Sequence, residues 1–553
     1  MTAAKFDAII VGGGHHGTIM ACYLAKAGMQ VAVLEKHTEL GGGAGSEEGP
    51  APGFRQNFCA HFTRFYSHPA YQDFQLRDEG LTYIFPEQNE GMIYEDGSSF
   101  IGYSAYRVVD PVTGRQEYSE TNVKKTYDQI RQFSTRDADV YLDLLDKYTR
   151  YWKAAFHEHR FSAPTPWGTP DALEALVTNP DSGLEPVHQF MSVRQLAYDF
   201  FESPELRTLF MRATPTSSGT FPDDPMGLQV LVHVLSLVLS FEPAAIAVGG
   251  TQAITDALVS AGRKLGVQYF LGQDVDEILI ENGRATGVKL ADGSQFTAPL
   301  VVSSLGVPQT MLRLARNYPV NDKIRHRLNN VHYDRGQILW GNVAMHELPQ
   351  YTAAATNPEV GPQPRLYWGP KDPDYLASKY QHEIFTLGFP SQLFILTAPD
   401  SIWDRTRAPG DAHTVLIEEF TAPRRLFTPS EWLRMKDEFM AAALQQWRHY
   451  APNMTPDNVI AHRIYSPYEV GASHPDMLEG GWTEGSMIAS QLGRFRPIPE
   501  LSDYRTPIKN LYLCSSNLHS AAGIGRGSSY NCYKVLANDF KLPKFWEMSG
   551  RQY

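Results

Sequence analysis

Short apolar runs separated by a glycine-rich turn dominate the first 35 positions of the chain. Residues 6–11 read as a strand and end at Gly12-Gly13-Gly14-His15-His16-Gly17. Apolar residues then recur with helical spacing as far as Gly28, and residues 31–34 form a second apolar run that closes on Glu35. Strand, glycine turn, helix, strand and acid in this order predict a complete βαβ unit.

Two later parts of the chain show the same kind of pattern. Residues 251–262 have one apolar helical face, and the tight turns Asn282-Gly283 and Asp292-Gly293 separate runs that read as strands. These runs are 267–271, 275–280, 285–290 and 295–302. The last segment returns to a strand at 510–514, a stretch of small residues and a helix at 530–540. We expect all these elements to join the first βαβ unit in one nucleotide-binding domain.

The segments between these blocks predict a second, mixed domain. Residues 137–210 are helical and charged, and residues 311–485 mix helices with aromatic-rich strands. Residues 228–241 form an apolar stretch that is too short to cross a bilayer and contains His233, so we interpret them as a buried helix or a substrate-tunnel wall. Contact with a membrane surface is the alternative. The predicted boundaries are 1–75, 245–310 and 486–553 for the nucleotide-binding domain, and 76–244 and 311–485 for the inserted domain.

Composition restricts the class of protein. The 553 residues include 49 Lys and Arg against 61 Asp and Glu, a net charge of −12 that argues against a nucleic-acid partner. Hydrophobic residues make up 42% of the chain, enough for large cores. Four cysteines without a CxxC pair predict neither a disulfide framework nor a metal site, and the residues before the first predicted strand lack the features of a secretory signal. We therefore expect a globular cytoplasmic protein, with peripheral membrane contact as the alternative.

The glycines and the acid of the first unit have separate physical tasks in dinucleotide binding. Gly12 permits the tight turn, Gly14 lets backbone N–H groups approach a pyrophosphate, and Gly17 lets the helix pack closely on the strand. The helix N-terminus adds partial positive charge, and Glu35 is placed to bind ribose hydroxyls. A second glycine cluster, Leu40-Gly41-Gly42-Gly43-Ala44, follows the acid. It allows close approach to a longer cofactor, which favours FAD over NAD.

These blocks, together with Pro52-Gly53-Phe54-Arg55 and the closing run from Gly523 to Asn531, resemble the phytoene desaturase-like FAD-dependent oxidoreductases. The similarity is greatest to the branch of pyridine nucleotide-disulphide oxidoreductase domain-containing protein 2 and the carotenoid desaturases and isomerases. The resemblance implies an α/β fold: a Rossmann-like FAD-binding domain of the amine-oxidase-like flavoprotein type, with an inserted α+β substrate domain. The cofactor-binding residues expected from the motifs and the resemblance are Gly12, Gly14, His15, His16, Gly17, Glu35, Lys36, Gly42, Gly43, Ala44, Val275, Ser304, Gly525, Gly527, Tyr530 and Asn531.

Five side chains are candidates for catalysis, each with a structural role as the alternative. His61 falls where the resemblance places residues facing the flavin, and an imidazole there is a candidate acid or base. His519 is a second candidate for proton transfer. Arg64 and Tyr66 are candidates for binding a polar substrate end. Arg526 is a candidate for stabilising negative charge on the reduced flavin or for holding a substrate carboxylate.

The resulting hypothesis is an FAD-dependent oxidoreductase that desaturates, saturates or isomerises C–C bonds by hydride transfer at the flavin N5. The expected substrate is lipophilic, either isoprenoid or carotenoid-like or aromatic. Oxygen and a quinone both remain open as the electron acceptor, and the oligomeric state is open. The alternatives are an amine-oxidase-like flavoenzyme and a non-catalytic escort or carrier protein of the same fold.

Overall fold

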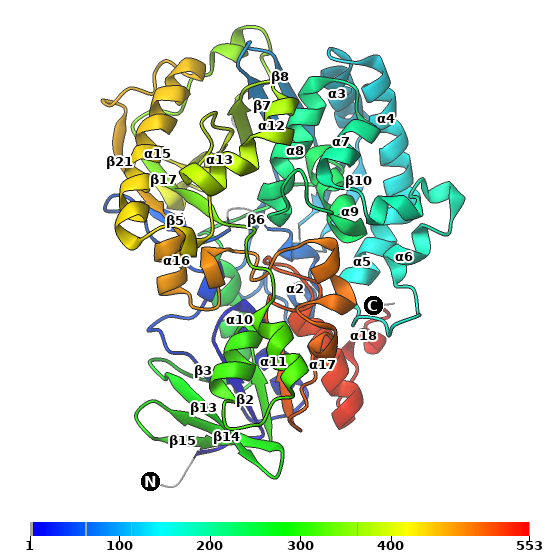
Figure 1. Ribbon diagram of the computed structural model, residues 1–553, viewed down its shortest axis with the longest axis vertical. Helices are drawn as coiled ribbons and strands as arrows, with labels where there is room; N and C mark the ends of the chain where they lie inside the picture. The colour runs from blue at the N-terminus through cyan, green and yellow to red at the C-terminus, as the bar shows by residue number, and fades with distance from the viewer. Residues whose placement is uncertain (1–3, 61–62, 112, 362, 552–553) are drawn as a thin grey trace.

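A computed structural model describes residues 4–60, 63–111, 113–361 and 363–551. Its lower half in Figure 1 is built on a five-stranded parallel sheet, with the strand order β12-β3-β2-β16-β22. Every residue of β2, β3, β16 and β22 is buried, as expected for a parallel sheet covered on both faces. The five strands are β2 (Ala8–Val11), β3 (Val31–Leu34), β12 (Gln268–Phe270), β16 (Leu300–Ser303) and β22 (Leu511–Leu513).

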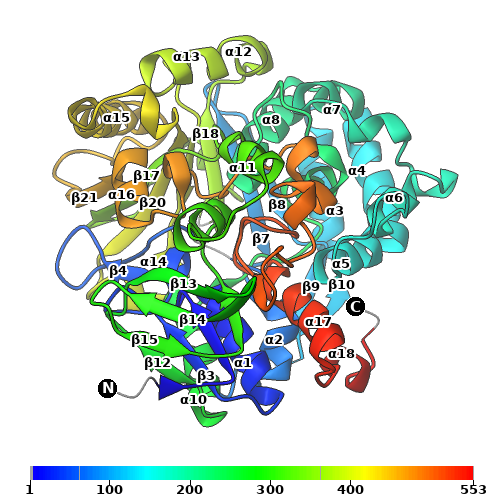
Figure 2. The same ribbon diagram turned by 60° about the horizontal axis from the view of Figure 1, so that its bottom comes forward.

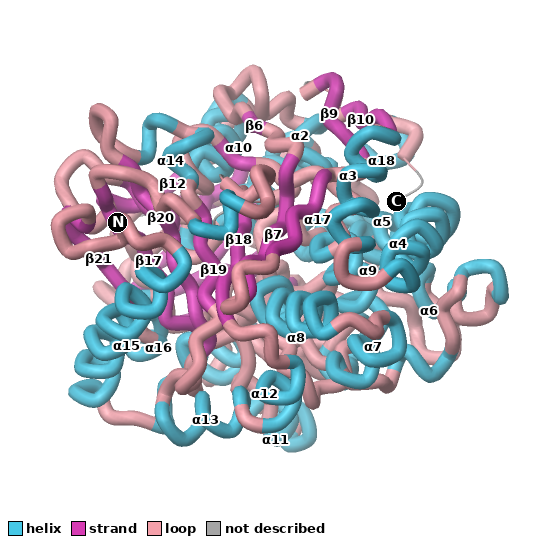
Figure 3. The backbone as a smooth tube through the Cα atoms, turned by 90° about the horizontal axis from the view of Figure 1, so that it is seen from above, coloured by secondary structure: helices cyan, strands magenta, loops and turns pink. Residues whose placement is uncertain are grey.

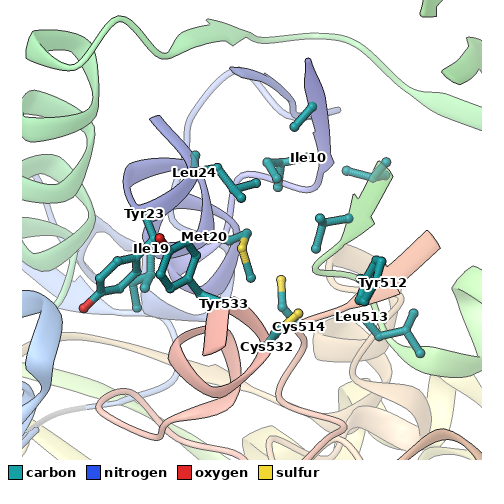
Figure 4. Close-up of a cluster of buried hydrophobic side chains, with 14 of the residues drawn as sticks. Ile10, Ile19, Met20, Tyr23, Leu24, Tyr512, Leu513, Cys514, Cys532 and Tyr533 are labelled. Atoms are coloured by element: carbon teal, nitrogen blue, oxygen red, sulfur yellow. The ribbon is translucent and has the colours of Figure 1, made fainter. Parts of the chain in front are cut away.

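Three segments far apart in the chain build this sheet. Residues 8–34 supply the central strands, residues 268–303 add a strand on either side of them, and residues 511–513 form one edge. Figure 4 shows buried side chains where the first and last segments meet, among them Tyr23, whose ring stacks on that of Tyr533 with the centroids 5.0 Å apart. The helices of this half are α1 (His15–Lys26), α2 (Pro69–Asp73), α10 (Gln252–Lys264), α11 (Asp322–Asn329), α17 (Ser528–Phe540) and α18 (Phe545–Met548).

A four-stranded sheet lies beside the parallel sheet and is prominent in Figure 2. Residues 295–302, which we expected to form one strand, are split between the two sheets: Gln295–Thr297 pairs antiparallel with β14, and Leu300–Ser303 pairs parallel with β2. Pro299, which has no N–H group to donate to a ladder, lies at the break. The sheet has the order β1-β15-β14-β13, with β1 (Ala4–Lys5), β13 (Val275–Glu281), β14 (Arg284–Leu290) and β15 (Gln295–Thr297).

The upper half contains a mixed seven-stranded sheet with helices on both faces (Figure 3). Side chains alternate between the faces: Met92 and Tyr94 join a core shared with the helices of residues 120–238, while Ile93 joins a core shared with α15. In order across the sheet the strands are β21 (Val459–Tyr465), β17 (Ile338–Met345), β20 (His413–Phe420), β19 (Ile395–Ala398), β18 (Arg365–Gly369), β7 (Gln88–Tyr94) and β8 (Ser99–Tyr103).

Several helices of the upper half begin at a capping side chain. Thr428 and Glu431 form a capping box at the start of α15, with Pro429 in the first turn. α9, which covers most of the apolar stretch 228–241, is buried as expected. The helices are α3 (Glu120–Arg131), α4 (Thr135–Lys147), α5 (Lys153–Phe161), α6 (Ala172–Leu176), α7 (Val193–Phe200), α8 (Pro204–Ser218), α9 (Gly227–Val238), α12 (Pro373–Ser378), α13 (Tyr380–Leu387), α14 (Asp400–Trp403), α15 (Pro429–Tyr450) and α16 (Pro467–Ser473).

The predicted fold class is confirmed: an α/β dinucleotide-binding half carries an inserted α+β half. The precise boundaries between the two halves stay a prediction. Among the described residues, no helix combines the length and the apolar character needed to cross a membrane.

Candidate functional site

The glycine turn between β2 and α1 closes the wall of a large cavity between the two halves of the protein. Gly12 has φ +97°, a conformation that glycine adopts without steric cost. A Cβ on Gly17 would come closer than 3.0 Å to the carbonyl oxygen of Gly12, so glycine is required where α1 meets the turn. A Cβ on Gly14 would meet only Gly41, at 3.9 Å, and Gly14 lines the cavity. The turn therefore leaves space at Gly14, where a pyrophosphate is expected.

Glu35 lies at the end of β3 and holds the glycine turn in place. Its carboxylate accepts hydrogen bonds from the N–H of Gly13 at 2.7 Å and from the N–H of His37 at 2.9 Å. The side chain is 9% exposed and lines the cavity. A carboxylate oxygen can accept further hydrogen bonds, so this geometry suits a ribose hydroxyl.

The second glycine cluster runs along the first. The N–H of Gly41 donates to the carbonyl of Gly13 at 3.1 Å, and a Cβ on Gly42 would lie 3.3 Å from the Cα of Gly14. Gly42 and Gly43 line the cavity, whereas Ala44 is buried and does not.

Lys36, Val275 and Ser304 also line the cavity. The Ser304 hydroxyl donates to the carbonyls of Val11 and Gly12, each at 3.0 Å, which ties the end of β16 to the glycine turn. The cofactor-side residues predicted from distant segments therefore face one space.

His15 and His16 begin α1 at the same cavity wall. Burial lowers the pKa of His15 to about 4 and holds the pKa of His16 well below its usual range, so both imidazoles are neutral. His16 Nδ1 pairs with the Ser529 hydroxyl at 3.2 Å, while the Nε2 atoms of both histidines are buried and have no partner among the described residues. Buried polar atoms without a partner are costly, so these two nitrogens, the space at Gly14 and the Glu35 carboxylate together fit a polar dinucleotide such as FAD.

The predicted catalytic residues are only partly brought together. Arg64, Gly525 and Arg526 line the cavity beyond the glycine turn. Tyr66 instead packs edge-on against Tyr83 and Phe85, with its hydroxyl 3.3 Å from the Gln116 amide. His61 lies outside the described residues.

His519 does not line the cavity either. Its Nε2 lies 2.7 Å from the carbonyl oxygen of His159, and burial lowers its pKa to about 3. A neutral ring held in this way serves packing, not proton transfer to a ligand in the cavity.

Gly527, Tyr530 and Asn531, the last predicted cofactor residues, do not line the cavity but pack behind the residues that do. Gly527 precedes α17, and its N–H donates to the Ser520 hydroxyl at 2.9 Å. Tyr530 is fully buried against Tyr23, and the Asn531 amide donates to the carbonyl of Arg160 at 3.1 Å. These contacts position the turn around Gly525 and Arg526.

Several residues that sequence reasoning missed also line the cavity, and the sequence around each carries no motif. They come from α5, α8, β17, β18, β20 and the loops between elements. They include Arg160, Thr216, Ile338, Arg365, Glu418, Trp482 and Glu484. Cys59 lines the cavity too, and so do His233 and Leu237 of α9, in the stretch 228–241 that we interpreted as a buried helix or a substrate-tunnel wall.

Two of the groups that line the cavity, Glu484 and Cys59, have strongly shifted pKa values. Burial, with a smaller contribution from Asp476, raises the pKa of Glu484 to about 8. Burial also raises the pKa of Cys59 to about 12, so this thiol stays protonated. Across the described residues, no cluster of His, Cys, Asp and Glu side chains has the arrangement of a metal site.

Residues 10–74 match the model of the NAD(P)-binding Rossmann-like domain. Several relatives match over nearly the whole chain. The chain is 23% identical to one of the subunits of limonene dehydrogenase from Castellaniella defragrans, over 98% of this chain and 96% of the relative. It is 25% identical to pyridine nucleotide-disulfide oxidoreductase domain-containing protein 2 of Mus musculus, over 97% and 94%. It is 24% identical to a neurosporene-forming phytoene desaturase of Cereibacter sphaeroides, over 94% and 91%.

Among solved structures, a variant of putrescine oxidase superposes with a TM-score of 0.59 at 14% identity, over 97% of this chain and 99% of the other. At that identity the likeness concerns the fold. Together these findings confirm the predicted similarity to phytoene desaturase-like oxidoreductases and the amine-oxidase-like fold.

Proposed function

We propose that this protein is an FAD-dependent oxidoreductase that acts on C–C bonds of a lipophilic substrate. One observation carries the proposal: the cavity that begins at Gly14 and Glu35 continues to a chamber lined by Leu237, Ile338 and Trp482. An apolar substrate in that chamber would lie in the same cavity as the cofactor. The names of the relatives, limonene dehydrogenase and phytoene desaturase, support the same class of reaction.

The chain's own residues hold the cofactor and shield the reaction. We propose that the N–H groups around Gly14 and the N-terminus of α1 bind the pyrophosphate, and that Glu35 binds a ribose hydroxyl. When bound, FAD supplies a centre that accepts or releases hydride. The enclosing walls from α9 and β17 keep water away from the substrate carbon.

A side chain that lines the chamber would donate or accept the proton that the reaction requires. Glu484 keeps its proton near neutral pH because burial raises its pKa to about 8, which suits a general acid or base. His61, the predicted acid or base, lies outside the described residues and stays a candidate. Isomerisation, saturation and desaturation share this requirement for one proton donor or acceptor, with oxygen or a quinone as the final acceptor in the oxidative case.

The amine-oxidase alternative receives less support from the chamber itself. Arg64, Arg160 and Arg526 all line it. Cationic side chains disfavour a protonated amine at the same place. The escort alternative would not need the intact glycine turn and the buried carboxylate of Glu35.

The visible spectrum of the purified protein tests the proposal. Absorbance near ~450 nm that moves to the supernatant on heating shows non-covalent flavin, and an anaerobic screen of monoterpenes and longer isoprenoids then follows bleaching of that band. A colourless protein that also fails to take up added FAD would contradict the proposal. Chromophore that stays with the denatured chain would indicate covalent attachment and direct attention to Cys59.

A further inference from the structure

One wall of the chamber is cationic. Arg64, Arg160 and Arg526 line it and come from three distant parts of the chain. Arg160 donates from Nη2 to the carbonyl of Gly525 at 2.9 Å, next to Arg526 in sequence. A Cβ on Gly525 would lie 3.4 Å from the backbone of Phe65, the neighbour of Arg64. These contacts bring the three arginines to one place.

Arg526 is the arginine most available to a ligand. Its side chain is buried, with 7% of the residue exposed, and no acceptor among the described residues bonds to its guanidinium. Burial, together with the positive charges of Arg160, Arg64 and Arg496, lowers its pKa to about 9. Holding an unpaired cation in a buried place is unfavourable unless an anion arrives.

The acidic groups nearby are already engaged. Glu90 forms an ion pair with Arg365 at 3.0 Å, and Glu242 pairs with the Lys153 ammonium at 2.8 Å. Arg64 donates to two main-chain carbonyls, those of Glu242 and Pro243, at 3.2 and 3.3 Å. A carbonyl satisfies the donor but does not neutralise its charge.

Five carboxyl groups line the same cavity: Glu35, with Asp274 and Asp476 beside it, and also Glu418 and Glu484. Burial raises the pKa of both Glu418 and Glu484, so each holds its proton more readily than a carboxyl in water. They offset little of the arginine charge. The chamber therefore has an excess of positive charge at the wall formed by Arg526, Arg64 and Arg160.

Other walls of the chamber are apolar, from Leu237, Ile338, Trp482 and Ile524. We infer that the substrate is amphiphilic: an apolar body contacts these four side chains, and one carboxylate or similar oxyanion binds Arg526 together with Arg64 and Arg160. A planar guanidinium pairs well with a carboxylate through two parallel hydrogen bonds. The inference rests on the proposed function, since it concerns the substrate end of the same cavity.

Binding of a matched acid and alcohol to the FAD-saturated protein tests the inference. Decanoate and decan-1-ol are titrated separately, followed by calorimetry and by the difference spectrum of the flavin. Decanoate is expected to bind at least about tenfold more tightly than decan-1-ol, since a charge-assisted hydrogen bond is stronger than a neutral one. R526M is expected to remove this preference while leaving decan-1-ol binding unchanged.

R505M is the matched control. Arg505 lies in the same C-terminal segment but is outside the cavity, paired with Asp539 at 2.8 Å and Asp503 at 2.9 Å. It should keep the preference for the acid. The comparison of the two ligands on the natural chain is decisive even where R526M fails to fold.

Equal affinity of the natural chain for the two ligands overturns the inference, as does an R526M variant that still prefers decanoate. A change of flavin midpoint potential in R526M with unaltered decanoate binding would assign Arg526 to the cofactor and also overturn it. Failure of the proposed function is distinguishable, because the flavin band is recorded before any ligand is added.

Discussion

Two glycines three positions apart in the turn before α1 are expected to respond very differently to alanine. A Cβ on Gly17 would lie closer than 3.0 Å to the Gly12 carbonyl and 3.0 Å from the Ser304 hydroxyl. A Cβ on Gly14 would meet only the Gly41 carbonyl at 3.9 Å. Gly14 has φ −67°, which alanine adopts without strain. G17A therefore crowds the fold, while G14A crowds only the space facing the cavity.

The magnitudes follow from these contacts. Overpacking against backbone costs about 3 kcal/mol, at the upper end of the usual range, because the carbonyl cannot rotate away. Replacing a helical glycine by alanine raises the free energy of unfolding by about 1 kcal/mol, because alanine has the higher helix propensity. We expect G17A to lower the free energy of unfolding by about 2 kcal/mol and G14A to leave it nearly unchanged. G14A should instead weaken FAD binding by at least about tenfold, or roughly 1.4 kcal/mol.

Urea unfolding of the flavin-free variants, followed by circular dichroism, measures the first effect. Quenching of FAD fluorescence on binding measures the second. The expected pattern is a lowered urea midpoint for G17A alone and a raised FAD dissociation constant for G14A at unchanged midpoint. A G17A variant as stable as the natural chain, or a G14A variant with natural FAD affinity, would refute the assignment of the two glycines to packing and to the cofactor.

Two further predictions concern buried charge. Because the pKa of Glu484 is raised from 4.5 to about 8, the folded chain keeps a proton that the unfolded chain releases between these values. The free energy of unfolding should therefore fall as pH rises through that window, by up to about 1.4 kcal/mol per pH unit. Urea melts of the natural chain and of E484Q from pH 5 to 8 measure this dependence, which E484Q should flatten. The same pH dependence in both proteins would contradict a raised pKa of Glu484. R496M should lower the free energy of unfolding by about 3 kcal/mol, because Arg496 donates at 2.7 Å to the carbonyl of Thr483 and at 3.1 Å to that of Ser516. Thermal melting measures this loss, and R434M, a substitution of an exposed arginine, is the control that should keep the natural stability.

Much of the dinucleotide-binding half was predictable because its signals are local. Strand, turn, helix and acid follow one another within 35 residues, and a buried parallel strand reads as a continuous apolar run. The pairing of residues 88–103 with strands from 338–420 had no such signal, since it depends on contacts between distant segments. The change of sheet near Pro299 was missed for the same reason.

The residues of the site also divide into those with a local sequence signal and those without one. Glu35 and Gly14 were predicted because a motif encodes their geometry, and both line the cavity. Arg160 and Glu484 reach the cavity from unrelated elements, and neither has neighbours in sequence that indicate a site. Tyr530 lies within a recognised motif, yet its ring enters the core, because position along the chain does not determine which way a side chain points.

The order of segments in the parallel sheet has a consequence for synthesis of the protein. β16 separates β2 from β22, so the sheet is complete only when residues 511–513 have left the ribosome, long after β2. Until then the growing chain exposes the apolar edge of β16 and the surface of α1 that later packs against α17. Such delayed pairing slows folding and favours aggregation of unfinished chains. Nascent chains of this protein are therefore expected to depend on chaperones until β22 and α17 emerge.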